Sequence, residues 1–265
     1  MVSNPIIAIT GAGSGIGRAL AQLANRRGYR LALADINLAA IEALRLELGL
    51  DATHCLTNEL DVSDFEAVNA WRDQILSVFG GVDIVINNAG IALIANAEVQ
   101  SNADIERIMD VNFWGVVYGS KAFLPLLRQS KDPHLVNVSS IFGIMAVPSQ
   151  SAYNASKFAV RGYTEALRQE VEEDGIHVCC VHPGGIKTNI VQSATILNTD
   201  RNREQAIADF DTMAPTTPAQ AAETIFRAID RRQNRCLIGR DAKWMSLLTR
   251  LFPESYPRWL PKRPE

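Results

Sequence analysis

The feature that most constrains the fold lies near the start of the chain, where an apolar run leads into a glycine-rich turn and then an amphipathic segment. Residues 6–9 read Ile-Ile-Ala-Ile, an apolar run typical of a parallel strand covered on both faces. After the turn, apolar residues recur with helical spacing at Ile16, Ala19, Leu20, Leu23 and Ala24. The sequence therefore predicts a strand, a tight turn and a helix, the unit from which parallel α/β sheets are built.

The same alternation of strands and helices continues along the chain. Further strands are expected at residues 31–34, 84–86, 135–138, 176–181 and 236–238. Helices are expected between the strands, including residues 104–129, 152–173 and 219–232. With no internal repeat or linker, this pattern predicts a single α/β domain with a Rossmann-type, doubly wound parallel sheet of about seven strands.

Two helix starts carry capping signals. Asn37 precedes an apolar periodic segment and is expected to cap its first turn. Ser63 and Glu66 have the spacing of a capping box, so we expect the next helix to begin at Ser63.

Two segments depart from the alternation and set the expected boundaries. Residues 189–217 form a long connection of mixed apolar and charged residues, which we expect to act as a lid over a substrate. Residues 241–265 form a tail with amphipathic helical spacing at Trp244, Leu247, Leu248 and Leu251. We therefore expect a catalytic Rossmann-type domain over residues 1–240, followed by this tail.

The tail is locally cationic. From Arg240 to Glu265 the chain has six basic residues and three acidic ones, so the segment could lie on an anionic membrane surface. A single short helix binds bilayers weakly, however. Packing of the tail on the domain or on a neighbouring subunit is therefore the favoured interpretation, ahead of peripheral membrane contact.

Composition argues against several classes of protein. With 26 basic and 29 acidic residues the formal net charge is −3, which provides no general affinity for nucleic acid. The 4 cysteines lack CxxC spacing and indicate reduced thiols and a cytoplasmic protein. The 4 histidines lack metal-ligand spacing, so no metal site is expected.

The glycine-rich turn between Thr10 and Gly17 would let the backbone approach a pyrophosphate at a helix N-terminus. Because Ile16 stands where the third glycine of GxGxxG would be, the strict dinucleotide fingerprint is not satisfied. Asp35 ends the second strand and could accept hydrogen bonds from ribose hydroxyls. The alternative is that Asp35 only caps the next helix.

Tyr153 and Lys157 are one helical turn apart and share a face, although such pairs are often incidental. An ammonium at about 4 Å is worth about 4 kcal/mol at an effective dielectric constant of about 20, or at most about three pKa units. Desolvation of the lysine would reduce that effect. The pair could therefore give a tyrosine that exchanges a proton near neutral pH, as carbonyl/alcohol interconversion requires. Ser140 is a plausible donor to the same oxygen, or an ordinary strand-end serine.

Together these motifs resemble those of the compact short-chain dehydrogenases/reductases over about residues 5 to 240. The matching segments are Thr10-Gly11-x-x-x-Gly15-Ile16-Gly17, Asp61-Val62, Asn87-Asn88-Ala89-Gly90, Asn112, Ser140, Tyr153-x-x-x-Lys157 and Pro183-Gly184. The resemblance implies strand order 3-2-1-4-5-6-7 and a nicotinamide cofactor. It also implies a homodimer or homotetramer built on the helices near residues 104–129 and 152–173.

The resemblance also implies roles for individual residues. Tyr153 is expected to be the general acid/base, and Lys157 to lower its pKa and hold the nicotinamide ribose. Ser140 is expected to orient the substrate oxygen, and Asn112 to hold a water beside the lysine. With Tyr153 and Lys157, the expected cofactor contacts are Gly11, Ser14, Gly15, Ile16, Gly17, Asp35, Asp61, Val62, Asn88, Ala89, Gly90, Pro183, Gly184, Ile186 and Thr188.

The function expected from these residues is hydride transfer between a nicotinamide cofactor and a lipophilic secondary alcohol or its ketone. The segments expected to flank the nicotinamide, residues 91–94, 141–147 and the lid, are apolar and offer no evident Arg or Lys to clamp an acid. Asp35 favours NAD over NADP, because its carboxylate would repel a 2′-phosphate and Ile36 supplies no cation. Arg18 is the residue that could alter this preference.

Two alternatives to this function remain. One is a catalytically silent NAD(P)-binding scaffold or sensor, although such proteins usually lose the tyrosine or lysine that this chain retains. The weaker one is an epimerase or dehydratase of the extended relatives, whose longer substrate domains do not fit into 265 residues.

Overall fold

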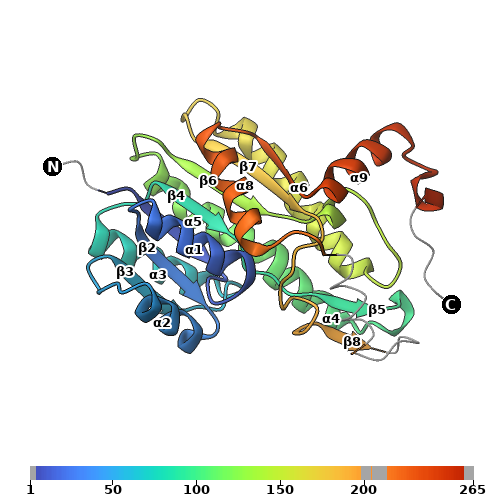
Figure 1. The fold of residues 1–265 in the computed structure, drawn as a ribbon, viewed down its shortest axis with the longest axis horizontal. Coiled ribbons are helices and arrows are strands. Elements are labelled where there is room, and N and C mark those ends of the chain that lie inside the picture. The colour runs from blue at the N-terminus through green and yellow to red at the C-terminus, as the bar shows by residue number, and fades with distance from the viewer. Residues whose placement is uncertain (1–3, 198–203, 205–213, 260–265) are drawn as a thin grey trace.

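The protein is built around one parallel sheet (Figure 1). The computed structural model describes residues 4–197, 204 and 214–259. The sheet has seven strands in the order β3-β2-β1-β4-β6-β7-β9, and every neighbouring pair is parallel. The strands are β1 Ile6–Thr10, β2 Arg30–Asp35, β3 Cys55–Glu59, β4 Ile84–Asn87, β6 His134–Val138, β7 His177–Pro183 and β9 Arg235–Ile238. The expected fold class and strand order are confirmed.

Strand β3 is the one to which the sequence analysis assigned no residues. It lies at the edge of the sheet, and only Cys55 of its five residues is buried. Since burial on both faces produces the continuous apolar runs of central strands, a half-exposed edge strand carries a weaker signal.

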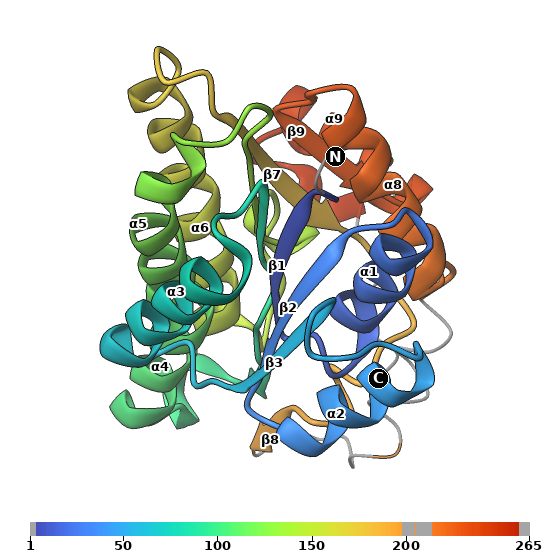
Figure 2. The same cartoon turned by 90° about the vertical axis from the view of Figure 1, so that its left-hand side faces the viewer.

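Helices cover both faces of the sheet (Figure 2). On one face lie α1 Gly15–Arg26, α2 Leu38–Glu47 and α8 Pro218–Asp230; on the other lie α3 Phe65–Phe79, α5 Gly115–Leu127 and α6 Ser151–Glu170. A hydrophobic core lies between the sheet and the helices on each face. Successive β1 side chains alternate between these cores: Ile7 and Ile9 pack on the side of α1, α2 and α8, whereas Ile6 and Ala8 pack on the side of α3, α5 and α6. Burial on both faces explains the uninterrupted apolar run of this strand.

The two capping predictions have different outcomes. Asn37 caps α2 as expected, since its side-chain oxygen accepts a hydrogen bond from the Ala40 amide at 3.1 Å. The capping box at Ser63 is wrong, because Asp64 is the N-cap of α3 and accepts from the Ala67 amide at 3.0 Å. The Ser63 hydroxyl instead donates to the Asp61 carboxylate at 2.6 Å.

The continuous helix expected over residues 104–129 is interrupted. The chain forms α4 Asn102–Met109, a π-helical turn η2 Asp110–Trp114, and then α5. π-Helical turns within α-helices are frequent at functional sites. Here the turn contains Asn112, a predicted site residue that is fully buried.

A second, two-stranded sheet lies beside the main one. It pairs β5 Leu93–Ala95 with β8 Thr195–Leu197 in parallel, so the first part of the expected lid packs along the segment after β4. Residues 198–203 and 205–213 of that expected lid lie outside the described residues.

The tail begins with α9 Arg240–Leu251, followed by the short helix η4 Tyr256–Trp259 (Figure 1). Ala242 is buried against the short helix η3 Ile141–Gly143 and the residues after it, and the Tyr256 hydroxyl accepts from the Ala146 amide at 3.0 Å. The side of α9 with Trp244, Leu247 and Leu251 is exposed. Residues 260–265 lie outside the described part of the chain.

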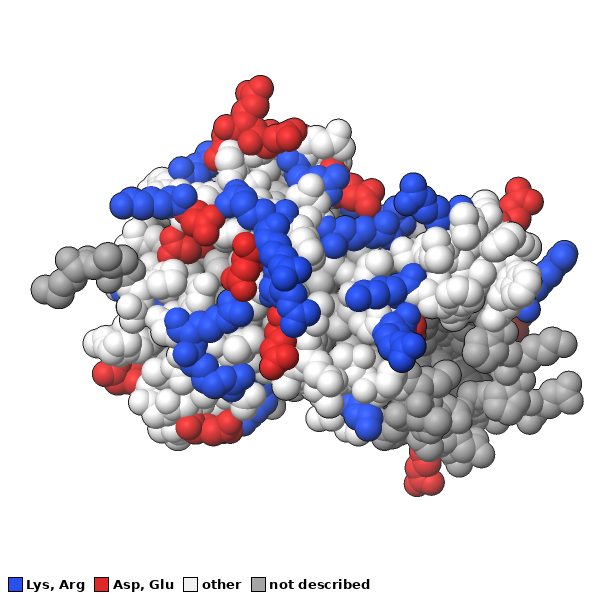
Figure 3. Space-filling view, turned by 45° about the horizontal axis from the view of Figure 1, so that its top comes forward, with Lys and Arg blue, Asp and Glu red and all other residues white. Residues whose placement is uncertain are grey.

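Acidic and basic side chains are interspersed over the face drawn in Figure 3. Several are paired across the fold, such as Arg27 with Asp230 at 3.0 Å and Arg232 with Asp132 at 2.6 Å. All four cysteines are buried and free. Among the described residues, no helix combines the length and the apolar character needed to cross a membrane.

His182 is a fully buried histidine in β7. Its Nδ1 donates a hydrogen bond to the Ser140 carbonyl oxygen at 3.0 Å, and burial lowers its pKa from 6.5 to about 4. Between these two values the unfolded chain binds a proton that the folded protein does not. The free energy of unfolding therefore falls as the pH falls from about 6.5 to about 4.

We expect His182→Asn to reduce this acid sensitivity, because asparagine can donate to the Ser140 carbonyl without titrating. Urea unfolding at several pH values measures the effect. Between about pH 6.5 and 4, the wild type should lose up to about 1.4 kcal/mol more per pH unit than the variant. Above about pH 7 the two profiles should run parallel. Equal slopes in the acid range would contradict the assignment.

Candidate active site

A cavity of about 1940 Å³ opens at the carboxyl ends of the parallel strands. Ligands of open α/β sheets bind at this edge, because the loops that follow neighbouring strands converge there. The predicted site residues line the cavity except Gly17 and Asn112, which do not reach its surface. Residues distributed from Gly11 to Thr188 are thus brought into one site.

The glycine-rich turn is tied to the end of β4. Gly11 has a φ of 64°, and a Cβ atom on Gly17 would lie 2.1 Å from the Gly11 carbonyl oxygen, so the turn and α1 are in close contact. The Asn88 side chain donates to the Thr10 and Gly11 carbonyls at 2.9 and 3.2 Å. Ser14, the N-cap of α1, makes no side-chain capping bond. The first-turn amides of α1 therefore suit a pyrophosphate.

Asp35 joins the end of β2 to this turn. Its Oδ2 accepts from the Gly13 amide at 2.8 Å, and its Oδ1 accepts from the Asn37 amide at 2.9 Å. Since Asn37 is the cap of α2, the interpretation of Asp35 as only a helix cap is wrong. The Asp35 side chain also lines the cavity, whereas Arg18 is ion-paired with Glu47.

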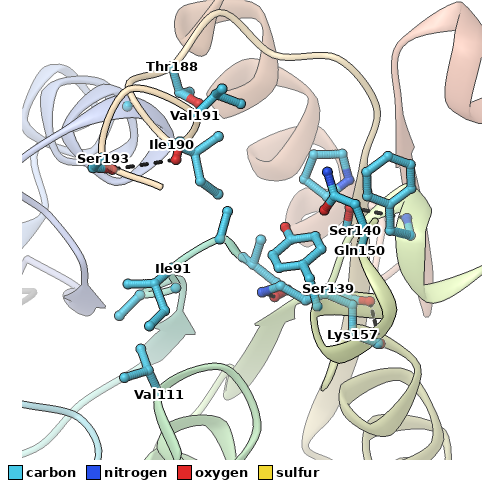
Figure 4. Close-up of a pocket in the computed structure, with 18 of the residues that line it drawn as sticks. Ile91, Val111, Ser139, Ser140, Gln150, Lys157, Thr188, Ile190, Val191 and Ser193 are labelled. Atoms are coloured by element: carbon cyan, nitrogen blue, oxygen red, sulfur yellow. Dashed lines mark hydrogen bonds between the residues drawn. The ribbon is translucent and has the colours of Figure 1, made fainter. Parts of the chain in front are cut away.

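Tyr153 and Lys157 project from α6 into the buried wall of the cavity. The Tyr153 ring packs edge-on against Phe142, with 6.1 Å between the ring centroids. The Lys157 ammonium donates to the Val138 carbonyl at 3.2 Å and lies 5.7 Å from the centroid of the Tyr153 ring. Figure 4 shows Ser140 and Lys157 on the same side of the cavity.

The pKa values of this pair differ from expectation. Burial raises the pKa of Tyr153 to about 12, although a hydrogen bond with Ser140 lowers it, and burial lowers the pKa of Lys157 to about 8. The expectation that Lys157 brings the tyrosine pKa towards neutral is therefore not met in this state. The reason is that desolvation disfavours both charged forms, while the ammonium is hydrogen-bonded to a main-chain carbonyl.

Asn112 braces the loop after β4. Its Oδ1 accepts from the Ile91 amide at 2.8 Å, and its Nδ2 donates to the Ile91 carbonyl at 3.0 Å and to Ser156 Oγ at 3.1 Å. A Cβ atom on Gly90 would lie 3.1 Å from Asn112 Oδ1 and 3.3 Å from Lys157 Nζ. The π-helical turn thus places an amide side chain beside the lysine and behind the cavity wall.

The remaining predicted positions come from the ends of β3 and β7. Asp61 and Val62 follow β3, and the Asp61 carboxylate accepts from the Ser63 amide at 2.9 Å. Pro183 ends β7, and Ile186 forms a parallel bridge with Thr216. Asp61, Val62, Pro183 and Ile186 line the cavity, whereas Thr216 does not.

The wall across from Ser140 and Lys157 is mainly apolar: Figure 4 shows Ile91, Ile190 and Val191 on that side, together with the hydroxyl-bearing Thr188 and Ser193. This lining includes the first part of the expected lid. Ile190 and Ile196 also pack in the cluster that contains Tyr153. The substrate end of the cavity therefore combines a polar corner, formed by Ser140, Tyr153 and Lys157, with a mainly apolar wall.

Sequence reasoning missed several lining residues. Asp241, Met245 and Pro257 reach the cavity from the tail, and Glu106 and Arg107 reach it from α4. The signal for Asp241 was present, since it is an acid directly after Gly239 at the start of an amphipathic pattern. Glu106 and Arg107 carried no such signal, because they belong to none of the motifs in the sequence.

The short chain dehydrogenase family model matches residues 5–197. SadH of Mycobacterium tuberculosis, named as an oxidoreductase, is 47% identical over 258 residues, which cover 96% of this chain and 92% of SadH. Dehydrogenase/reductase SDR family member 7B of Bos taurus is 36% identical over 239 residues, covering 88% of this chain and 72% of the relative.

Solved structures show the same likeness. A short-chain dehydrogenase/reductase from Burkholderia phymatum in complex with NAD has a TM-score of 0.87 and 27% identity, covering 99% of this chain and 98% of its own. A short-chain dehydrogenase from Streptomyces avermitilis has a TM-score of 0.85 and 26% identity, covering 98% and 97% of the two chains. From its sheet, its cavity and these relatives, the chain belongs to the short-chain dehydrogenase/reductase family, the NAD(P)-dependent oxidoreductases.

Proposed function

We propose that the protein interconverts a lipophilic secondary alcohol and its ketone, with NAD as the cofactor and Tyr153 as the general acid/base. The observation that carries the proposal is the placement of Tyr153, Ser140 and Lys157 at one corner of a cavity whose opposite wall is mainly apolar. The apolar wall would hold the hydrocarbon part of a substrate, while the polar corner would receive its oxygen.

When bound, the cofactor would supply or accept the hydride, while side chains of the protein would donate and accept the proton. Tyr153 donates its hydroxyl proton to the developing alkoxide during reduction and takes it back during oxidation. Ser140 orients the substrate oxygen by a hydrogen bond. Lys157, whose pKa is lowered to about 8, can exchange a proton near neutral pH and so restore the tyrosine hydroxyl.

Asn112 would support this relay from behind the wall. Its amide is used by the Ile91 backbone and by Ser156, so in this structure it fixes the loop that approaches Lys157. The proposed cofactor contacts follow the cavity from Gly11 to Thr188. The open first turn of α1 would hold the pyrophosphate.

The silent scaffold is not favoured. Burying Tyr153 and Lys157, which raises the pKa of the tyrosine and lowers that of the lysine, costs folding free energy. A protein that only binds a cofactor would gain nothing from that cost. Perturbed titratable groups inside a cleft are instead typical of active sites.

We expect Tyr153→Phe to lower kcat/KM by a factor on the order of 10² to 10⁴, because it removes the proton donor and little volume. Binding of NADH, followed by fluorescence titration, should be almost unchanged. Lys157→Ala should impair both turnover and binding, since the lysine has two proposed roles. Substantial turnover by Tyr153→Phe would remove this mechanism and favour the scaffold.

The preference for NAD over NADP is proposed from Asp35. Its carboxylate lines the cavity and would accept from ribose hydroxyls while repelling a 2′-phosphate. Arg18, which could offset that repulsion, is engaged by Glu47. The charges at this end of the cavity therefore favour a cofactor without the extra phosphate.

We expect a higher kcat/KM with NAD than with NADP. Asp35→Asn should reduce the ratio of kcat/KM with NAD to kcat/KM with NADP by about tenfold or more, because it removes the charge that repels the 2′-phosphate. Asp64→Asn, at an acid outside the cavity, is the matched control and should leave the ratio unchanged. If the wild type prefers NADP, the assignment of Asp35 is wrong and Arg18 is the next residue to test.

The substrate class is tested with a panel of secondary alcohols and ketones, followed by absorbance at 340 nm. We expect kcat/KM to rise with the hydrocarbon size of the substrate, since the wall at Ile91 and Ile190 is apolar. Arg107 is the one basic side chain among the described lining residues besides Lys157. Efficient turnover of a small acid, abolished by Arg107→Gln, would contradict the lipophilic assignment.

We also propose that the protein is a cytoplasmic homodimer or homotetramer. Trp114 of η2 and Phe158 of α6 are 42% and 40% exposed, so the helices named for the interface present aromatic surface. The free, buried cysteines fit a reducing compartment. For the tail, packing on the domain or a neighbouring copy remains favoured over membrane contact, because α9 already buries Ala242 and Leu248.

A further inference from the structure

The turn after β7 passes from Pro183 through Gly184 and Gly185 to Ile186, and all four residues line the cavity. Its backbone is held at both ends. The Gly184 amide donates to the Ile238 carbonyl at 2.9 Å, and the Lys187 amide donates to the Thr216 carbonyl at 2.9 Å. Between these points, the Gly185 amide donates to a side chain from the tail, Asp241 Oδ2, at 2.7 Å.

The Asp241 carboxylate is seated between two glycines. A Cβ atom on Gly184 would lie 2.1 Å from Asp241 Oδ2, and one on Gly239 would lie 2.1 Å from Asp241 Oδ1. Neither position has room for a side chain while the carboxylate stays where it is. The second oxygen, Oδ1, is buried and has no hydrogen-bond partner among the described residues.

Two features make this contact firm. The bond from the Gly185 amide to a carboxylate is charge-assisted, a class that is shorter and stronger than neutral hydrogen bonds. Asp241 also lies in the first turn of α9, where the helix dipole favours a negative charge. The helix itself is fixed by Ala242, which is packed against Ile141, Ile144 and Met145.

We propose that Asp241 is a positioning residue for the nicotinamide end of the cofactor site. Its carboxylate fixes the Gly184–Gly185 turn, and through that turn the bound cofactor. The inference rests on the proposed function, which assigns Gly184, Ile186 and Thr188 to the cofactor. It gives the tail a part in cofactor binding, although residues 241–265 lie beyond the expected catalytic domain.

The test compares three variants of the full-length protein by NADH fluorescence titration, steady-state kinetics and amide hydrogen exchange of residues 183–188. Asp241→Ala removes the acceptor and should raise the NADH dissociation constant about tenfold. Asp241→Asn keeps an acceptor oxygen and should restore most of the affinity. Leu248→Ala, which loosens buried packing of α9 without touching the turn, should lower Tm and leave NADH affinity within about twofold.

Exchange of the turn amides should be faster in Asp241→Ala than in the wild type, whereas Asp241→Asn should resemble the wild type. The KM of the alcohol should change little in each variant. If Asp241→Ala does not fold, Asp241→Ser serves instead, because it removes the carboxylate and keeps a polar side chain in the first turn of α9. It should weaken NADH binding in the same way.

Wild-type affinity in Asp241→Ala, or equal losses in Asp241→Ala and Leu248→Ala, would overturn the inference and leave Asp241 as an anchor of the tail. Equal losses in Asp241→Ala and Asp241→Asn would also contradict it, since the proposed role is that of an acceptor. A wild type that binds no NADH would instead refute the proposed function itself.

Discussion

The parallel pairing of β1 with β4 is the constraint on which the site depends. It sets the end of β1 beside the end of β4, so that Thr10 Oγ1 accepts from the amides of Asn88 and Ala89 at 3.0 and 3.1 Å. The glycine turn can then pack on α1, and Asn112 can reach Ile91 from the next helix. Each later step uses the same edge of the sheet, because parallel strands end there together.

Burial decides the chemistry of the polar corner. Tyr153 and Lys157 are 7% and 3% exposed, and desolvation moves their pKa values in opposite directions, to about 12 and about 8. A simple charge–charge estimate for the pair predicts a more acidic tyrosine. Desolvation has the larger effect here because both groups leave water, and the lysine ammonium is hydrogen-bonded to the Val138 carbonyl.

The cavity also draws on parts of the chain that lie outside the central alternation. The π-helical turn supplies Asn112, the first part of the lid supplies Ile190, and the tail supplies Asp241. The tail is therefore an integral part of the site wall, even though it follows the last strand. This arrangement links the packing of α9 to the loop that is proposed to hold the nicotinamide.

The sequence by itself determined the alternation of strands and helices and the glycine-rich turn, because central strands buried on both faces and glycines in tight contact leave strong local patterns, as at Ile6–Ile9 and Gly11. The strand order and most of the site residues followed from the resemblance of its motifs to those of a known family. The sequence could not place β3, whose exposed edge weakens the pattern, or the break at Asp110–Trp114. Only the tertiary structure decided that Arg18 pairs with Glu47, that Lys157 contacts Val138, and that Asp241 meets Gly185. These contacts join residues distant in sequence or depend on desolvation, and neither leaves a local signature in the chain.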